Sequence, residues 1–260
     1  MSVLSDFVEK IPIKNGDVVL FSSDSLRLNV YMKKNNEELD FHKLLDLLIE
    51  KIGVNGTLLL PTYNWDFCRG ETFDYLNTPS KTGAISQAAL SHPAFKRTKH
   101  PLYSWAVTGK DKEYLCSLNN NDSFGKDSPF NYLYERKAKN VILDVTMQNC
   151  FTYVHYVEEC IGVPYRYLKK FTGEYIDEKG KEENKTISMY VRDYDLEAEA
   201  SLEQLERFLL KEKIIDETFI GYSRVLCIPL FETYDVIKND IIYNKAKKIA
   251  TYKGQYDSEE

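Results

Sequence analysis

Apolar residues gather in short blocks along the first quarter of the chain, and their spacing predicts a strand, a helix and a second strand. Residues 17–22 form a short apolar run that turns polar at its end, which is typical of a buried strand. Residues 41–52 carry leucine and isoleucine at helical spacing and end at Gly53, which predicts a helix. Residues 56–61 are apolar but too short for a helix. Elements in this order predict a parallel sheet with two covered faces.

The middle of the chain predicts a long loop, two short elements and a hairpin. The loop runs from 62 to about 82, and loops of this length in a compact domain are usually functional or mobile. A short helix is predicted over 84–90 and an interior strand over 141–145. Polar and apolar residues alternate over 169–194 around a turn at 177–180, which predicts an antiparallel hairpin.

The C-terminal part of the chain predicts a helix, a strand and a last helix. A capping-box pattern at 201–204 starts the first helix, residues 224–231 form the strand, and apolar positions over 236–242 mark the last helix. Because no repeat or linker interrupts the pattern, we expect one domain over 1–260, with 169–235 as a candidate subdomain. The predicted fold class is α/β: a layered α/β/α sandwich with a central mixed sheet and an appended antiparallel hairpin.

The composition narrows the class of protein and of partner. The formal charge of −6 and the pI near 5.4 argue against nucleic acid, which needs a basic face, and favour a small cationic ligand. No apolar run is long enough to span a membrane, and no signal peptide is evident. The five cysteines are scattered and include no CxxC pair, as in reduced cytoplasmic proteins. We therefore expect a cytoplasmic protein without a metal, and the oligomeric state stays open.

Histidine is scarce, and one of the four stands out. They are His42, His92, His100 and His155. His155 lies between two tyrosines and shortly before Glu158 and Glu159. A histidine with an unperturbed pKa near ~6.5 can accept a proton at working pH. If this segment is helical, Glu158 lies one turn after His155 and can orient its ring. Asp193 and Asp195, after the hairpin, are further candidates for that supporting role.

Four stretches combine turn residues with hydroxyls: 67–74 with 78–83, 97–104, 123–130 and 152–159. Their order resembles the antibiotic N-acetyltransferase family, which has the fold of the aminoglycoside 3-N-acetyltransferases. The family pattern contains Cys-Arg-Gly-Glu, Thr-Pro-Ser, His-Pro-x-x-Ser, Phe-Gly-x-x-Ser-Pro and Thr-x-x-His-x-x-Glu followed by Gly-Val-Pro-Tyr-Arg. All of these occur here in that order, from about residue 17 to about residue 231. Two positions depart from the pattern: Phe21 replaces a histidine, and Asp144 replaces a glycine.

The resemblance implies transfer of an acyl group from a coenzyme A thioester to a primary amine, by direct attack without an acyl-enzyme. His155 matches the catalytic histidine. Ser80 is expected to bond the thioester carbonyl or relay a proton, or else to cap the helix that starts at Ala84. Contacts with coenzyme A are expected from Ser22, Ser23, Lys96, Arg97, Lys99, His100 and Ser104. The basic residues among them suit phosphate groups, although a solvated charge run is the alternative. Contacts with the acceptor are expected from Tyr63, Trp65, Phe67, Arg69, Glu71, Asp74 and Glu159.

Three rival interpretations stay open at this point. A metal hydrolase would use His155, Glu158, Glu159 and Cys160 as ligands, although catalytic zinc normally needs three protein ligands in a clear cluster. A cysteine nucleophile would be Cys150 with His155 as its base. A sugar-binding protein would keep the fold without turnover.

The acceptor is the least constrained prediction. We favour a nucleotide-linked amino sugar, a 4-amino-4,6-dideoxyhexose, because the loop over 62–76 is rich in aromatic rings that suit stacking on a nucleobase. The alternative is an aminoglycoside antibiotic, whose positive charges suit the acidic balance of the chain. The length of the acyl chain is not fixed by the sequence.

Overall fold

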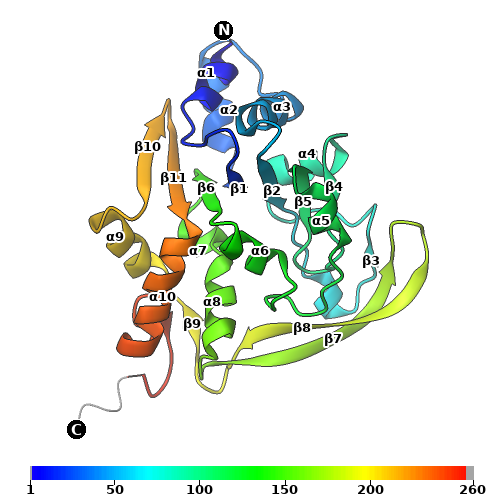
Figure 1. The fold of residues 1–260 in the computed structure, drawn as a ribbon, viewed down its shortest axis with the longest axis vertical. Coiled ribbons are helices and arrows are strands. Elements are labelled where there is room, and N and C mark those ends of the chain that lie inside the picture. Colours follow the sequence, from blue (N-terminus) through cyan, green and yellow to red (C-terminus); the bar gives the residue numbers. More distant parts are fainter. Residues whose placement is uncertain (1, 256–260) are drawn as a thin grey trace.

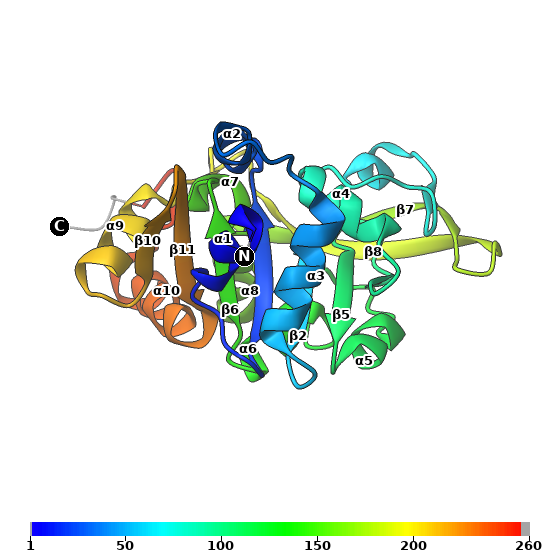
Figure 2. The ribbon, with the colours of Figure 1, turned by 90° about the horizontal axis from the view of Figure 1, so that it is seen from above.

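A seven-stranded mixed sheet forms the centre of the computed structural model, which describes residues 2–255 (Figures 1 and 2). In spatial order its strands are β10 (Asp216–Ile220), β11 (Ser223–Pro229), β6 (Lys139–Leu143), β1 (Val18–Ser23), β2 (Thr57–Pro61), β5 (Trp105–Gly109) and β4 (Lys96–Arg97). The three central strands β6, β1 and β2 run parallel, and antiparallel strands flank them on both sides. The predicted parallel pairing of β1 with β2 is confirmed.

Helices cover both faces of this sheet, because side chains alternate between the faces along each strand. In β1, Val19 and Phe21 belong to a core shared with α1 (Val3–Glu9), α2 (Leu26–Lys34), α3 (Phe41–Ile52) and α4 (Ala84–Ser91). Leu20 belongs to the opposite core, shared with α6 (Pro129–Glu135), α8 (Tyr153–Ile161) and α10 (Leu230–Asn244). The predicted α/β/α sandwich is therefore confirmed.

A long hairpin crosses beside the sheet and extends past it (Figure 1). Its strands, β7 (Arg166–Ile176) and β8 (Glu182–Arg192), form a three-stranded sheet with β3 (Phe73–Asp74). The hairpin was predicted, but β10 and β11, which also lie within 169–235, belong to the main sheet. The remaining short elements are η1 (Asp66–Arg69), α5 (Lys112–Ser117), α7 (Met147–Cys150), β9 (Glu199–Ala200), α9 (Glu203–Lys211) and β12 (Ala250–Thr251).

Several boundaries differ from the sequence-based prediction, among them two in the C-terminal part of the chain. The strand expected over 224–231 ends at Pro229, where α10 begins. The prediction of a capping box at 201–204 is wrong, because the N-cap of α9 is Leu202 and no side chain caps the helix. Ser201 lies outside the helix because its N–H donates to the carbonyl of Ile249 at 2.9 Å.

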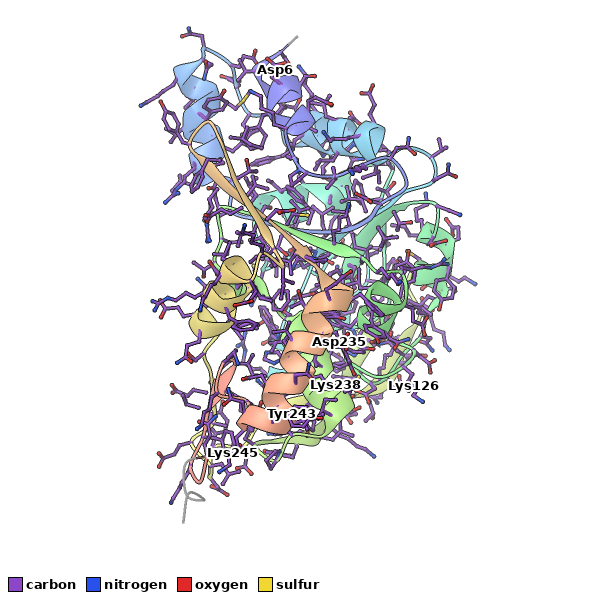
Figure 3. All side chains as sticks on the ribbon, turned by 60° about the vertical axis from the view of Figure 1, so that its left-hand side comes forward. Asp6, Lys126, Asp235, Lys238, Tyr243 and Lys245 are labelled. Carbon is purple, nitrogen blue, oxygen red and sulfur yellow. The ribbon has the colours of Figure 1, made fainter. Side chains whose placement is uncertain are left out.

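The outer side of α10 is exposed to solvent. Figure 3 labels Asp235, Lys238 and Tyr243 on this helix, and the Tyr243 side chain is largely exposed. Within residues 2–255, no helix is both long enough and apolar enough to cross a membrane.

Candidate active site

His155 lies in the first turn of α8 and lines a cavity together with residues of the hairpin, and its local sequence explains this position. The helix ends at Gly162, which adopts a left-handed conformation with φ of 75° and closes the last turn. The chain then enters β7 at Arg166. The segment is therefore helical, as the spacing of His155 and Glu158 required.

His155, Glu158 and Arg166 form one cluster, in which a hydrogen bond joins His155 to Glu158 and an ion pair joins Arg166 to Glu158. The Nδ1 atom of His155 lies 2.6 Å from Oε2 of Glu158, and Nε of Arg166 lies 2.7 Å from the same oxygen. The side chains of Glu158 and Arg166 are almost fully buried, whereas His155 keeps 23% of its side chain exposed. Because a carboxylate only accepts hydrogen bonds, Nδ1 carries the proton and Nε2 presents its lone pair.

The charges of this cluster favour a neutral imidazole. Burial lowers the pKa of His155, and the positive charges of Arg166 and Arg192 lower it further, against the opposing effect of Glu158. Burial raises the pKa of the Glu158 carboxyl, but His155 and Arg166 outweigh this effect and bring it below its usual value. The cluster therefore combines an ionised carboxylate with a neutral base.

A cavity of about 400 Å³ opens over His155, and we call it the His155 pocket. It lies between the loop over 62–76 and the hairpin of β7 and β8. Its lining residues are Trp65, Cys68, Arg69, Tyr103, His155, Arg166, Tyr167, Lys169, Phe171, Met189, Tyr190, Val191, Arg192 and Tyr194. It brings together the predicted residues His155, Trp65 and Arg69.

A second cavity of about 260 Å³ lies at the carboxyl ends of β1, β2 and β6, and we call it the strand-end pocket. Its lining residues are Ser22, Ser23, Asp24, Pro61, Tyr63, Trp65, Lys81, Thr82, Gly83, Val145, Asn149, Cys150 and Thr152. Trp65 lines both pockets. The predicted residues Ser22, Ser23 and Tyr63 therefore lie together, in a pocket that shares Trp65 with the His155 pocket.

Ser80 lies at the edge of this arrangement. Its Oγ accepts from the N–H of Thr82 at 3.2 Å and lies 2.9 Å from the Thr82 hydroxyl. The expectation that Ser80 caps α4 is wrong, because Gly83 is the N-cap and no side chain caps that helix. Thr82 rather than Ser80 lines the strand-end pocket.

The basic residues that were predicted to bind phosphate are largely paired with other groups of the protein. The Arg97 guanidinium is buried and donates to Ser104 Oγ at 3.0 Å and to the Thr78 carbonyl at 2.5 Å. Burial lowers its pKa to about 10. Lys96 pairs with Glu113 at 3.2 Å, and Lys99 pairs with Glu178 at 3.4 Å. Arg97 therefore holds the long loop against β4 and is not available to a phosphate.

His100 and Ser104 are also structural residues, contrary to the expectation that they line a channel. Both are buried and line none of the cavities described here. Nδ1 of His100 accepts from the N–H groups of Leu102 and Tyr103, at 3.2 and 3.1 Å. Burial lowers the pKa of His100 to about 3. The Ser104 hydroxyl donates to the Thr62 carbonyl at 2.9 Å.

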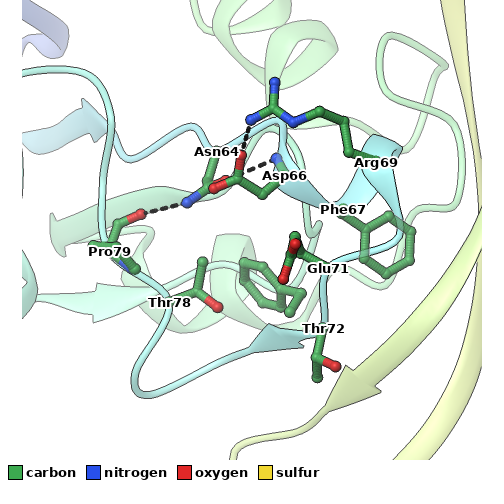
Figure 4. Close-up of a pocket in the computed structure, with 9 residues that line it drawn as sticks. Asn64, Asp66, Phe67, Arg69, Glu71, Thr72, Thr78 and Pro79 are labelled. Atoms are coloured by element: carbon green, nitrogen blue, oxygen red, sulfur yellow. Dashed lines mark hydrogen bonds and ion pairs between the residues drawn. The ribbon is translucent and has the colours of Figure 1, made fainter.

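The other residues predicted to contact the acceptor fall into two groups. Some line a third hollow, and Asp74 makes hydrogen bonds within its own turn. Phe67, Arg69 and Glu71 line a hollow of about 340 Å³ beside η1, where Arg69 pairs with Asp66 (Figure 4). Asp74 instead accepts from two backbone N–H groups of its own turn, at 2.9 and 3.0 Å.

Glu159 interacts with Asp122. Burial and the neighbouring Asp122 raise the pKa of Glu159 to about 8. Asp193 does not support His155, because its Oδ1 accepts from the N–H of Asp195 at 2.9 Å while Glu158 occupies the supporting position.

The two departures from the family pattern have different surroundings. Phe21 is fully buried in the core with α1 and α3, on the face of β1 opposite to α8, so it shapes neither pocket. Asp144 adopts a left-handed φ of 58° where glycine would be unstrained, and its Oδ1 accepts from the N–H of Arg224 at 2.8 Å. The side-chain bond therefore supports a backbone conformation that aspartate tolerates better than most residues.

The surroundings of Cys150 argue against the alternative hypothesis that it is a nucleophile with His155 as its base. Its thiol lines the strand-end pocket and lies 3.2 Å from the Thr146 carbonyl. Burial raises the pKa of Cys150 to about 12, so the reactive thiolate is suppressed. Among residues 2–255, no three His, Cys, Asp or Glu side chains are arranged to hold a metal ion.

Several residues at the site were not singled out from the sequence. Thr82, Lys169, Tyr190 and Arg192 line the two pockets, and Arg166 joins the His155 cluster. Arg166 is the last residue of the Gly-Val-Pro-Tyr-Arg stretch, so the family pattern could have pointed to it. Lys169 and Arg192 could not be found in this way, because only the path of the hairpin brings them to the pocket.

Comparisons with known proteins point to one family. A sequence model described as aminoglycoside 3-N-acetyltransferase matches residues 32–241. The SPbeta prophage-derived aminoglycoside N(3')-acetyltransferase-like protein YokD of Bacillus subtilis (strain 168) is 25% identical over 138 residues, which cover 44% of this chain and 51% of YokD. The match thus spans about half the length of that curated relative.

Solved structures share the fold over most of their length. Aminoglycoside acetyltransferase AAC(3)-Xa superposes with a TM-score of 0.74 at 17% identity, over 91% of this chain and 92% of its own. AAC-IIIb in a binary complex with CoASH gives 0.71 at 15% identity, over 89% and 92%. AAC-VIa bound to sisomicin gives 0.73 at 17% identity, over 93% and 96%. At these identities the likeness establishes the common fold.

Proposed function

Because the chain belongs to the aminoglycoside 3-N-acetyltransferase family, we propose that it transfers an acetyl group from acetyl-CoA to a primary amine of an amino sugar in the cytoplasm. The observation that carries this proposal is the cluster of His155, Glu158 and Arg166 at the floor of an open pocket. All five cysteines are unpaired thiols, which suits a reducing compartment.

His155 serves as the general base in this proposal. A sugar amine is largely protonated at neutral pH and must lose a proton to attack. The ammonium first loses one proton to solvent, and Nε2 of His155 takes a second proton from the resulting amine as its nitrogen bonds to the thioester carbon. The carbon–sulfur bond then breaks, and the departing thiolate takes the proton back from His155. Glu158 stabilises the imidazolium that exists between these two steps, and Arg166 keeps Glu158 ionised.

The strand-end pocket suits the thioester donor. It presents the hydroxyls of Ser22, Ser23 and Thr82. Ser23 Oγ is buried without a hydrogen-bond partner, which marks a group free to bond a polar ligand. A related protein, AAC-IIIb, binds CoASH. Donor and acceptor would then approach each other from opposite sides of Trp65, near His155.

The acceptor class has two candidates. An aminoglycoside is the first to test, because the family is named for that substrate and AAC-VIa binds sisomicin. The second candidate is the nucleotide-linked 4-amino-4,6-dideoxyhexose favoured by the sequence, which differs from an aminoglycoside in carrying phosphates and little positive charge.

A thiol-release assay tests the proposal. The purified chain is mixed with acetyl-CoA and either a 2-deoxystreptamine aminoglycoside or a nucleotide-linked 4-amino sugar. His155→Ala should lower turnover by about 10²–10⁴-fold while leaving binding of coenzyme A nearly unchanged, because a base acts chiefly in the transition state. The matched control is His42→Ala, since His42 is exposed on α3, where its ring contacts Ser91 and His92, and it lines neither pocket. Binding of both substrates without thiol release would instead identify a sugar-binding protein.

A further inference from the structure

The His155 pocket has an unusual balance of charge for an acidic chain. Among its described lining residues, Arg69, Arg166, Lys169 and Arg192 are cationic and none is a carboxylate. The whole chain carries a formal charge of −6. Positive charge is therefore concentrated at the place where the reaction is proposed to occur.

Two of these four cations are neutralised by the protein, and two are not. Arg166 pairs with Glu158, and Arg69 pairs with Asp66. Lys169 and Arg192 make no ion pair with any residue in the range 2–255. Their charged groups lie over aromatic rings, that of Lys169 at 5.4 Å from the Phe171 ring centre and that of Arg192 at 5.6 Å from Tyr194.

The placement of Arg192 has an energetic cost. In the hairpin, Arg192 lies directly opposite Arg166, and like charges opposite each other destabilise a pair of strands. Arg192 also disfavours the protonated form of His155. Neither effect helps folding, and both would be offset by an anion bound between the hairpin and His155. A polycationic acceptor would instead add positive charge to this pocket.

We propose that the His155 pocket binds an acceptor that carries a phosphate group, and that Lys169 and Arg192 hold that phosphate. Guanidinium and ammonium groups are the side chains that pair best with phosphate. This inference rests on the proposed function, because it assigns the pocket to the amine acceptor. Phosphate also occurs in coenzyme A, so the test must separate these two sources.

Binding of inorganic pyrophosphate tests the site without knowledge of the acceptor. The full-length chain is titrated with pyrophosphate in a calorimeter, with and without saturating coenzyme A. We expect binding under both conditions, and we expect the Lys169→Gln/Arg192→Gln variant to raise the dissociation constant for pyrophosphate at least about tenfold. Lys170→Gln is the matched control, since Lys170 is the adjacent exposed lysine of β7 and lies outside the pocket.

Three outcomes overturn the inference: no pyrophosphate binding by the unmodified chain, equal binding by the double variant, or an equal loss in Lys170→Gln. If saturating coenzyme A abolishes pyrophosphate binding and the double variant also loses affinity for coenzyme A, the phosphate belongs to the donor and the acceptor assignment is wrong. Failure of the proposed function has a different signature. In that case pyrophosphate binds and the variants behave as expected, but no amine releases thiol.

Discussion

Glu158→Gln is the substitution that most directly tests the proposed cluster. It keeps the shape of the side chain but removes the charge that His155 and Arg166 share at 2.6 and 2.7 Å. Arg166, with 6% of its side chain exposed, would become a buried cation without a counter-charge. Removing one partner of a buried ion pair costs about 3–5 kcal/mol of folding free energy.

The same substitution should also affect the rate. A glutamine amide can donate to Nδ1 of His155, and this would place the imidazole proton on Nε2, where the base needs a lone pair. General-base catalysis is worth about 10²–10⁴-fold in rate, so we expect turnover to fall within that range. The rate loss and the stability loss have separate causes and are measured separately.

The assay compares turnover in thiol release with the denaturant midpoint of unfolding. Asp193→Asn is the control, because it makes the same chemical change in a carboxylate that bonds only the N–H of Asp195. Its turnover should stay within about twofold of the unmodified chain, as for surface substitutions away from special contacts. If Glu158→Gln loses stability but turns over normally, the carboxylate only holds Arg166 and our account of the base is wrong.

Two further predictions concern pH and the strand-end pocket. Since burial and Arg166 lower the pKa of His155, the fall in kcat/KM that remains after correction for titration of the amine acceptor should begin below about pH 6.5, as the imidazole protonates; a corrected fall that begins above pH 7 would contradict a lowered pKa. Thr82→Val should raise KM for acetyl-CoA, because Thr82 lines that pocket and its hydroxyl donates to the carbonyl of Pro61, another lining residue. Ser80→Ala removes a turn contact worth about 1 kcal/mol and should mainly affect stability. The two KM values decide between these residues, and the reverse pattern would restore Ser80 as the donor contact.

Local spacing predicted the parts of the site that lie on one element. His155 and Glu158 are three residues apart, and a single helical turn is enough to bring them together. The strand β2 and the helix α3 were also predicted, because an apolar run and a helical period both act within a few residues.

Arg97 shows where the same approach failed. A run of basic residues suggested a phosphate clamp, but Lys96 and Arg97 lie on a short strand, so their side chains point to opposite sides. The side chain of Arg97 therefore enters the interior and finds its partners in carbonyls of the loop over 62–78. Those partners are distant in sequence, and only the pairing of β4 with β5 places them there. The positions of Lys169 and Arg192 depend in the same way on the path of the hairpin.

The position of Trp65 has a consequence for how the two ligands affect each other. Trp65 lines both pockets, so a ligand that shifts its side chain in one pocket changes the shape of the other. Any such coupling is reciprocal: the factor by which donor alters affinity for acceptor equals the factor by which acceptor alters affinity for donor. Trp105, the other tryptophan in the sequence, is fully buried, whereas Trp65 is 38% exposed. Since Trp105 lines neither pocket, a change in indole fluorescence when a ligand binds reports chiefly on Trp65, and it offers a readout of cooperativity between the two pockets.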